Sequence, residues 1–160
     1  MQYPTDTPSP RHDAFLRRIR AFIPDDRIST DYLSRLAWGT DASFYHKLPR
    51  IVVRVVNEEE VSRLLRAASQ DLVPVTFRAA GTSLSGQAIT DSVIVVIGRD
   101  WERYTVHDGG ELITLQPGIV GERVNEILRP YGRIFGPDPA SKRAAMVLSL
   151  IHISEPTRPH

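Results

Sequence analysis

The chain has 160 residues, of which 41% are hydrophobic and 24% are charged, and its formal net charge is +1. This size and composition are ordinary for one globular domain, and the balanced charge gives no electrostatic reason to expect a nucleic acid or an anionic membrane as a partner. The sequence has no cysteine, which excludes disulfides, thiolate nucleophiles and cysteine-ligated clusters within this chain.

Residues 1–30 are expected to form an extension and one helix. The first ten residues are rich in proline, threonine and aspartate and should fray. From Asp13 onward, apolar residues recur at helical spacing, and the arginines between them favour a solvated face over a binding patch. Pro24 ends this helix, and residues 31–38 form a short second helix that Gly39 closes.

Residues 51–77 have the pattern of a strand, a helix and a second strand. The first strand covers residues 51–56, and Asn57 with Glu60 three positions later predicts a helix start of the capping-box kind. Because a helix separates the two strands, we expect them to be parallel, with a ligand-binding edge where the second strand ends. The apolar face of the helix is expected to consist of Val61, Leu64, Leu65 and Ala68.

The second half of the chain carries the signals of antiparallel structure. Val93–Ile97 is a continuous β-branched run and predicts a buried strand, and residues 101–107 and 111–116 are expected to pair as a hairpin around a turn at 108–110. Residues 133–136 are a candidate short strand after an amphipathic helix marked by Val120, Val124, Ile127 and Leu128. We therefore expect an α+β fold with a βαβ lobe followed by a mixed or antiparallel lobe.

The stretch with the most chemical information is residues 78–87, which follow an apolar run at 73–77. Its two glycines and small side chains allow the backbone to come close to a ligand. Consecutive N–H groups in such a turn can cradle phosphate oxygens, to which Thr82, Ser83 and Ser85 add hydroxyl donors. The glycine spacing matches neither the dinucleotide fingerprint nor the Walker loop. From spacing alone, a phosphate site and an ordinary Gly/Ser-rich turn are equally supported.

Three motifs in order, residues 78–87, 117–119 and 136–141, resemble the FAD-binding (PCMH-type, FAD-linked oxidase) domain of the p-cresol methylhydroxylase/vanillyl-alcohol oxidase superfamily. Within it, the chain resembles the D-lactate and D-2-hydroxyacid dehydrogenase branch, including members with an iron–sulfur domain. The resemblance covers residues 31–147. It implies a two-lobed FAD-binding domain that is truncated at its C-terminus.

The resemblance also implies which residues contact FAD. Arg78 has two interpretations, a phosphate partner or a structural ion-pair residue at the strand end, and the structural one is favoured. Gln87 either contacts the flavin ring or caps the turn. The later motifs have the simpler alternatives of a strand-to-helix turn and a rigid loop. The candidate cofactor-binding residues are Arg78, Ala80, Gly81, Thr82, Ser83, Leu84, Ser85, Gly86, Gln87, Pro117, Gly118, Pro137, Asp138 and Ser141.

No catalytic or metal-ligating residue is assigned to this chain. Its five histidines show no paired metal-ligand spacing. The resemblance places the catalytic histidine, the substrate-binding arginine and the metal ligands in a later cap domain. By the same resemblance, an iron–sulfur cluster would be expected only in the missing C-terminal part.

The expected function is that of a fragment of an FAD-dependent oxidoreductase. The intact enzyme would oxidise D-lactate or a related D-2-hydroxyacid by hydride transfer to flavin and pass electrons to a separate acceptor. This fragment alone is expected to be inactive. The alternatives are an FAD-dependent alcohol, sugar or glycolate oxidase, and a non-redox nucleotide-binding module. With no apolar run long enough for a transmembrane segment, we expect a cytoplasmic location, or a peripheral membrane one for the intact enzyme.

The last residues differ in character from the rest. Residues 148–159 resemble the translation of a transposon-type sequencing adapter. The alternative is a genuine short strand in which Ile151 and Ile153 alternate, followed by a polar end. We therefore expect three parts: an N-terminal extension and helix at 1–30, a partial FAD-binding domain at 31–147, and a non-native tail at 148–160.

Overall fold

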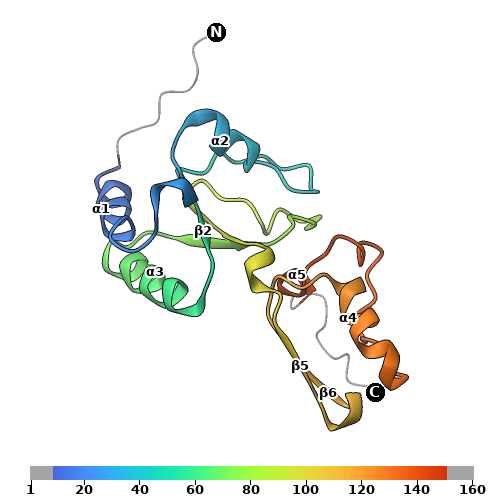
Figure 1. Ribbon diagram of the computed structural model, residues 1–160. Coiled ribbons are helices and arrows are strands. Elements are labelled where there is room, and N and C mark those ends of the chain that lie inside the picture. Colours follow the sequence, from blue (N-terminus) through green and yellow to red (C-terminus); the bar gives the residue numbers. More distant parts are fainter. Residues whose placement is uncertain (1–8, 151–160) are drawn as a thin grey trace, which may run out of the picture.

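The computed structural model describes residues 9–150, which form two lobes (Figure 1). The first lobe contains α1 (Pro10–Ile19), β1 (Ile28–Ser29), α2 (Tyr32–Ala37), β2 (Ile51–Val55), α3 (Glu58–Gln70), β3 (Val75–Arg78) and β4 (Val93–Ile97). The second contains β5 (Tyr104–His107), β6 (Leu112–Leu115), α4 (Gly121–Leu128) and α5 (Val147–Leu150). The expected α+β fold with two lobes is confirmed.

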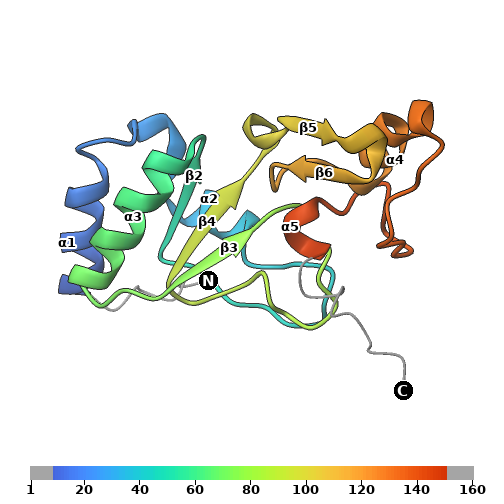
Figure 2. The same cartoon turned by 90° about the horizontal axis from the view of Figure 1, so that it is seen from below.

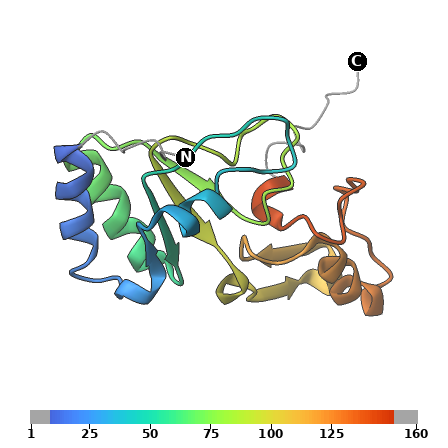
Figure 3. The same ribbon diagram turned by 90° about the horizontal axis from the view of Figure 1, so that it is seen from above.

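The first lobe is built on a four-stranded sheet with the order β1-β2-β4-β3. β2 and β3 are parallel, as expected for a βαβ unit, but β4 lies between them and pairs with both. All five residues of β4 are buried, which explains its unbroken run of valine and isoleucine. α1 and α3 cover one face of the sheet and α2 lies on the other (Figures 2 and 3).

α3 begins at the predicted cap, with a different partner for Glu60. The Asn57 side chain accepts a hydrogen bond from the Glu60 N–H at 2.9 Å, as a cap should. The Glu60 carboxylate accepts from the Val56 N–H at 3.0 Å and from two Arg27 nitrogens at 2.8 Å. The expected apolar face was wrong at Leu65, which is 41% exposed. Leu65 lies about 100° around the helix from the buried Leu64, on the solvent side.

The second lobe is organised around the predicted hairpin. β5 and β6 are antiparallel, with Tyr104 opposite Leu115. The hairpin starts later than expected, because Trp101 lies in a preceding 3-10 turn and its indole N–H donates to the Val55 carbonyl at 2.8 Å. The expected strand at 133–136 was wrong: this stretch is irregular, and the Phe135 N–H donates to the side chain of Asn125 in α4 at 2.8 Å.

α5 lies between the lobes. Figures 2 and 3 show it between the hairpin and the loops that follow α2 and β3. The N–H groups of Val147 and Leu148 donate to the carbonyls of Ile119 and Pro117 at 2.8 and 2.9 Å. The expected tail boundary therefore falls inside a short helix. The alternative strand with Ile151 and Ile153 lies outside the described residues.

The first ten residues were expected to fray, yet Pro10 is the first residue of α1, and residues 1–8 lie outside the described part. Within residues 9–150, none of the helices combines the length and the apolar character that crossing a membrane requires.

Candidate functional site

The turn at residues 79–87 follows β3 at the carboxyl edge of the parallel strands, where the sequence places it. Gly81 and Gly86 have φ values of +71° and +74°. L-residues rarely adopt this left-handed region, so the turn needs glycine at both positions. Open α/β sheets bind ligands at this edge.

Arg78 lies beneath the turn. Its side chain is buried, and its Nη1 donates to the carbonyls of Trp38 at 3.2 Å and Thr40 at 2.8 Å. The guanidinium also lies over the Trp38 ring, 5.2 Å from its centroid. A Cβ added to Gly81 would be 2.5 Å from Arg78 Nη2. Arg78 therefore links the turn to the end of α2, and its described hydrogen bonds run to main-chain carbonyls.

The electrostatic state of Arg78 follows from its burial. Burial lowers the pKa of its guanidinium, and the nearby carboxylate of Asp41 offsets only part of this shift. Arginine keeps its proton under these conditions, so a positive charge lies under the Gly81 backbone. The Arg78 Nε is buried without a hydrogen-bond partner within the described residues.

Ser83 organises the tip of the turn. Its hydroxyl donates to Gln87 Oε1 at 2.7 Å and accepts from the N–H groups of Ser85 and Gln87 at 3.2 and 3.3 Å. These bonds favour the turn-capping alternative for Gln87. The main-chain N–H groups of Ser85 and Gln87 therefore converge on a single acceptor, the Ser83 oxygen.

The segment at residues 39–47 adjoins this turn. The resemblance to the family implies that this entry segment lies near the flavin, but no pattern in its own residues predicts the contact. The Ala42 N–H donates to the Gly81 carbonyl at 3.0 Å. The Tyr45 ring lies so close to Gly86 that a Cβ there would be 2.9 Å from Tyr45 Cδ2. The small side chains around the turn are the signal that another segment packs closely on it, but they do not reveal which segment.

Pro117 and Gly118 lie at the junction of the lobes. The Gly118 N–H donates to the Trp101 carbonyl at 2.9 Å, and an added Cβ would be 2.3 Å from the Gly98 oxygen. Gly118 is thus required for backbone packing inside the chain, which favours the alternative of a strand-to-helix turn.

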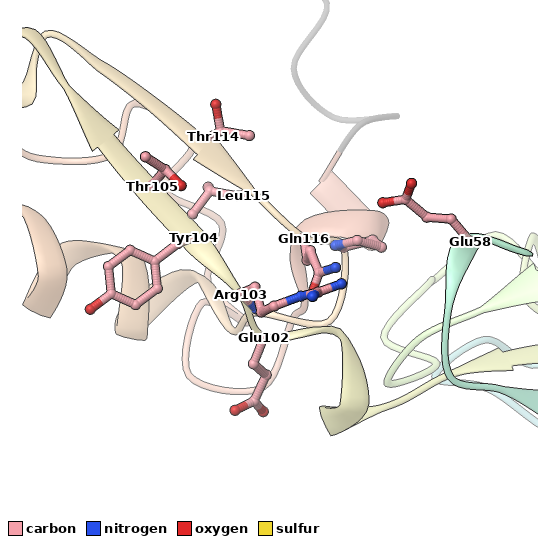
Figure 4. Close-up of a pocket in the computed structure, with 9 residues that line it drawn as sticks. Glu58, Glu102, Arg103, Tyr104, Thr105, Thr114, Leu115 and Gln116 are labelled. Carbon is pink, nitrogen blue, oxygen red and sulfur yellow. The ribbon is translucent and has the colours of Figure 1, made fainter.

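Two pockets adjoin this junction. The larger, of about 620 Å³, lies at the base of the hairpin, where Glu58 faces Arg103 and Gln116 (Figure 4). The smaller, of about 260 Å³, is mainly apolar and includes Phe77, Trp101 and Leu148. Pro117 lines both pockets and is the one candidate cofactor residue among their linings.

The third motif packs against α4. Asp138 accepts from Lys142 Nζ at 2.8 Å, and the Ser141 carbonyl accepts from the N–H groups of Ala144 and Ala145 at 2.8 Å. The Lys142 carbonyl accepts from the Glu122 N–H in α4 at 3.1 Å. Pro137 precedes this folded loop and is partly exposed. The three motifs are thus anchored to different parts of the chain, with α5 between the first and the second.

The part of the chain from residue 9 to residue 150 shows no cluster of three or more histidine, aspartate or glutamate side chains that could hold a metal ion. Two of its histidines make side-chain hydrogen bonds: His12 with Ser92 at 2.9 Å and His107 with Thr114 at 3.0 Å.

The curated relatives are, by name, hydroxyacid dehydrogenases and a glycolate oxidase subunit. The chain is 28% identical over 155 residues to D-2-hydroxyglutarate dehydrogenase of Pseudomonas putida, which covers 94% of this chain and 15% of the relative. It is 30% identical over 122 residues to the mitochondrial D-lactate dehydrogenase [cytochrome] of Arabidopsis thaliana, covering 73% and 22%. It is 31% identical over 107 residues to glycolate oxidase subunit GlcD of Escherichia coli K12, covering 66% and 21%. The chain therefore spans a small part of these relatives.

Solved structures share the fold. Alkyldihydroxyacetonephosphate synthase matches with a TM-score of 0.74 and 21% identity, over 94% of this chain and 31% of that chain. p-Cresol methylhydroxylase matches with a TM-score of 0.73 and 11% identity, over 92% and 30%. The family model described as an FAD binding domain matches residues 49–153, which is more than half of the chain. The chain therefore belongs to the PCMH-type FAD-binding domain family of FAD-linked oxidoreductases.

Proposed function

We propose that the chain provides the pyrophosphate cradle of an FAD-dependent oxidoreductase that oxidises D-lactate or a related D-2-hydroxyacid. The observation that carries this proposal is the turn at 79–87. It lies at the carboxyl edge of parallel strands, has two glycines with positive φ, and has the buried charge of Arg78 beneath it. This combination of main-chain donors and positive charge suits a diphosphate.

The candidate residues have distinct roles in this proposal. The N–H groups of residues 80–85 hold the pyrophosphate, helped by the hydroxyls of Thr82 and Ser83. Arg78 acts from below through its charge, and Gln87 closes the turn. The residues nearer the flavin ring are Pro117, Gly118, Pro137, Asp138 and Ser141.

FAD, when bound, supplies an acceptor for the hydride from the substrate α-carbon. The residues of this chain bind and orient the cofactor in this proposal, and none of them takes the hydroxyl proton of the substrate. The names of the relatives support a hydroxyacid substrate and a separate electron acceptor such as a cytochrome. We expect a cytoplasmic location for this part. Any iron–sulfur cluster would need ligands from outside this chain, which has no cysteine.

The proposed cradle is tested by titrating the chain with FAD and following flavin fluorescence. Gly81→Val should abolish saturable binding, because its side chain would meet the Arg78 guanidinium and its backbone would be strained at φ +71°. Gly109→Val is the matched control, since Gly109 has φ +63° and open space around it in the hairpin turn. It should lower stability without a selective effect on FAD. Unchanged FAD affinity in a folded Gly81→Val variant would sink the assignment.

The substrate class needs the intact oxidoreductase that this proposal implies. D-lactate, D-2-hydroxyglutarate and glycolate would be added to the flavin-loaded protein, with L-lactate as the control. Loss of the oxidised flavin absorbance with the D-hydroxyacids supports the proposal, and oxygen consumption would indicate an oxidase instead. A flavin that none of these compounds reduces would favour the non-redox nucleotide-binding module.

A further inference from the structure

Asp41 is held next to Arg78 by the backbone on either side of it. The carbonyl of the preceding residue, Thr40, accepts from Arg78 Nη1 at 2.8 Å. The N–H of the following residue, Ala42, donates to the Gly81 carbonyl at 3.0 Å. A Cβ added to Gly81 would in turn be 2.5 Å from Arg78 Nη2. Asp41 therefore lies between two contacts, one with the Arg78 guanidinium and one with the glycine above it.

The two carboxylate oxygens of Asp41 have different surroundings. Oδ1 accepts from the Ser43 N–H at 2.9 Å and from the Ser43 hydroxyl. Oδ2 is buried and has no hydrogen-bond partner within the described residues, and the same is true of Arg78 Nε. A buried charge without a partner is destabilising, and an opposite charge nearby offsets part of that cost. The structure thus brings a partly unpaired carboxylate to a cation whose described hydrogen bonds run to neutral carbonyls.

This arrangement has two electrostatic consequences at the turn. Among the described residues, Asp41 is the acid whose charge raises the pKa of Arg78 against the larger lowering by burial. The carboxylate stabilises the unliganded turn, because it reduces the cost of burying the guanidinium. It also weakens the attraction of the turn for an anion, because its charge opposes that of Arg78 at any point near both groups.

We propose that Asp41 is a positioning residue that acts through Arg78, stabilising the unliganded turn and at the same time lowering its affinity for a diphosphate. This inference rests on the proposed function, in which the turn at 79–87 holds the pyrophosphate, and it assigns Asp41 no contact with the cofactor. It links stability and affinity in opposite directions. A purely structural role for Asp41 would lower both when the residue is replaced.

The test is the Asp41→Asn substitution in the 160-residue chain. Asparagine keeps an oxygen that can accept from Ser43 but has no negative charge. The midpoint of urea unfolding should fall, because Arg78 loses its counter-charge. The dissociation constant of ADP, measured by titration calorimetry, should decrease by about two- to fivefold, because the cation is no longer opposed. Unchanged or weaker ADP binding in a folded Asp41→Asn variant would overturn the inference.

Asp91→Asn is the matched control for the loss of one negative charge. The Asp91 side chain is 79% exposed and precedes β4, at the edge of the sheet opposite the turn. This variant should bind ADP like the unmodified chain. Inorganic pyrophosphate, used in place of ADP, should also bind more tightly to Asp41→Asn. A gain in affinity for ADP that pyrophosphate does not share would contradict an action on the diphosphate.

A second substitution tests whether the effect passes through Arg78. In an Arg78→Met background, Asp41→Asn should lower the urea midpoint less than it does in the unmodified chain, because no cation is then left unpaired. Equal losses in the two backgrounds would mean that Asp41 acts only through its bonds to Ser43. If Asp41→Asn alone does not fold, the inference requires that the double variant folds.

The outcomes for this inference and for the proposed function are separable. If the unmodified chain binds FAD and Gly81→Val does not, but Asp41→Asn leaves ADP and pyrophosphate binding unchanged, the inference is wrong and the proposed function stands. If the unmodified chain binds neither FAD nor ADP nor pyrophosphate, both are wrong.

Discussion

His12 is a buried histidine whose hydrogen bonds define its tautomer. The Ser92 hydroxyl donates to the Pro74 carbonyl at 2.7 Å, so its oxygen accepts from His12 Nε2 at 2.9 Å. His12 Nδ1 then has no hydrogen and accepts from the Ser9 hydroxyl. The network joins α1 to the segment before β4 and uses the neutral imidazole.

This neutral histidine makes the stability of the fold pH-dependent. Burial, with the nearby charges of Arg50 and Arg11, lowers the pKa of His12 from its ordinary value of 6.5, although Asp13 and Asp91 oppose this. Below that value the unfolded chain binds a proton more readily than the folded one, so the contribution of His12 is complete above pH 6.5 and is lost as the pH falls through the folded-state pKa.

We therefore expect the midpoint of urea unfolding to fall between about pH 7 and pH 5 more steeply in the unmodified chain than in His12→Gln. The glutamine variant has no proton to gain at this position, and acidic groups elsewhere titrate equally in both proteins. Parallel pH profiles for the two proteins would contradict the assignment of the neutral tautomer.

At the scale of the elements, the segment between β6 and α4 packs closely on the backbone that follows β4, and Gly118 is the residue at this contact. An added Cβ would lie 2.3 Å from the Gly98 oxygen and 2.9 Å from the Trp101 oxygen, and both are main-chain atoms. Gly118→Ala should therefore lower the free energy of unfolding by about 1–3 kcal/mol or more, because the backbone must move.

Gly136→Ala is the matched control for this substitution. Gly136 has no atom within 4 Å of an added Cβ, and its φ lies outside the left-handed region. Denaturant unfolding of both variants should show a change within about 1 kcal/mol for Gly136→Ala. Equal destabilisation of the two variants would mean that Gly118 has no special packing role.

Elements with a local physical signature were the ones that the sequence predicted. The valine and isoleucine run of β4 and the Asn57 cap both act within a few residues, and both are present. The errors came from long-range packing. The side of α3 that faces the sheet decides that Leu65 is exposed, and residues 133–136 lack a strand partner.

The residues of the candidate site also divide into those that a local pattern predicts and those that long-range packing places. Gly81 and Gly86 were predictable because a turn with positive φ requires glycine, whatever lies around it. Tyr45 was not, because its contact with Gly86 joins segments that are far apart in the sequence. The charge of Arg78 was predictable from its residue type, but its bonds to the carbonyls of Trp38 and Thr40 follow from tertiary structure.

At the scale of the whole molecule, α5 connects the cores of the two lobes. Val147 packs with the core of the second lobe around Ile119, while Leu148 packs against the core of the first. Leu150 is buried, and its Cδ1 lies 3.6 Å from the Cβ position of Gly121. The short helix therefore contributes apolar contacts to both lobes.

Leu150→Ala should destabilise the chain by about 2–5 kcal/mol, as expected for a buried leucine. Leu33→Ala, at a position 72% exposed in α2, should change the free energy of unfolding by less than about 0.5 kcal/mol. Denaturant unfolding monitored by tryptophan fluorescence, to which Trp38 and Trp101 both contribute, measures both variants. A Leu150→Ala variant as stable as Leu33→Ala would show that α5 does not hold the lobes together.

The origin of this helix can be tested at the level of DNA. We propose that residues 148–160 derive from a sequencing adapter, and sequencing the source DNA across the Val147 codon decides the matter. If other residues follow Val147 there, Leu148 and Leu150 are not native to the fold and the adapter proposal is supported. If the DNA encodes Leu148 onward as printed, the adapter proposal is wrong.

The position of β4 in the sheet sets the order in which the chain can fold as it is synthesised. β2 and β3 leave the ribosome first, yet neither pairs with the other, since each forms its parallel ladder with β4. At ordinary rates of translation the β3 edge therefore waits unpaired until β4 emerges. Closing the sheet then requires β4, a strongly apolar strand, to insert between β2 and β3. We expect this insertion to limit the folding rate. Before it occurs, the strand edges are unpaired, and we expect the risk of aggregation to be greatest during that time.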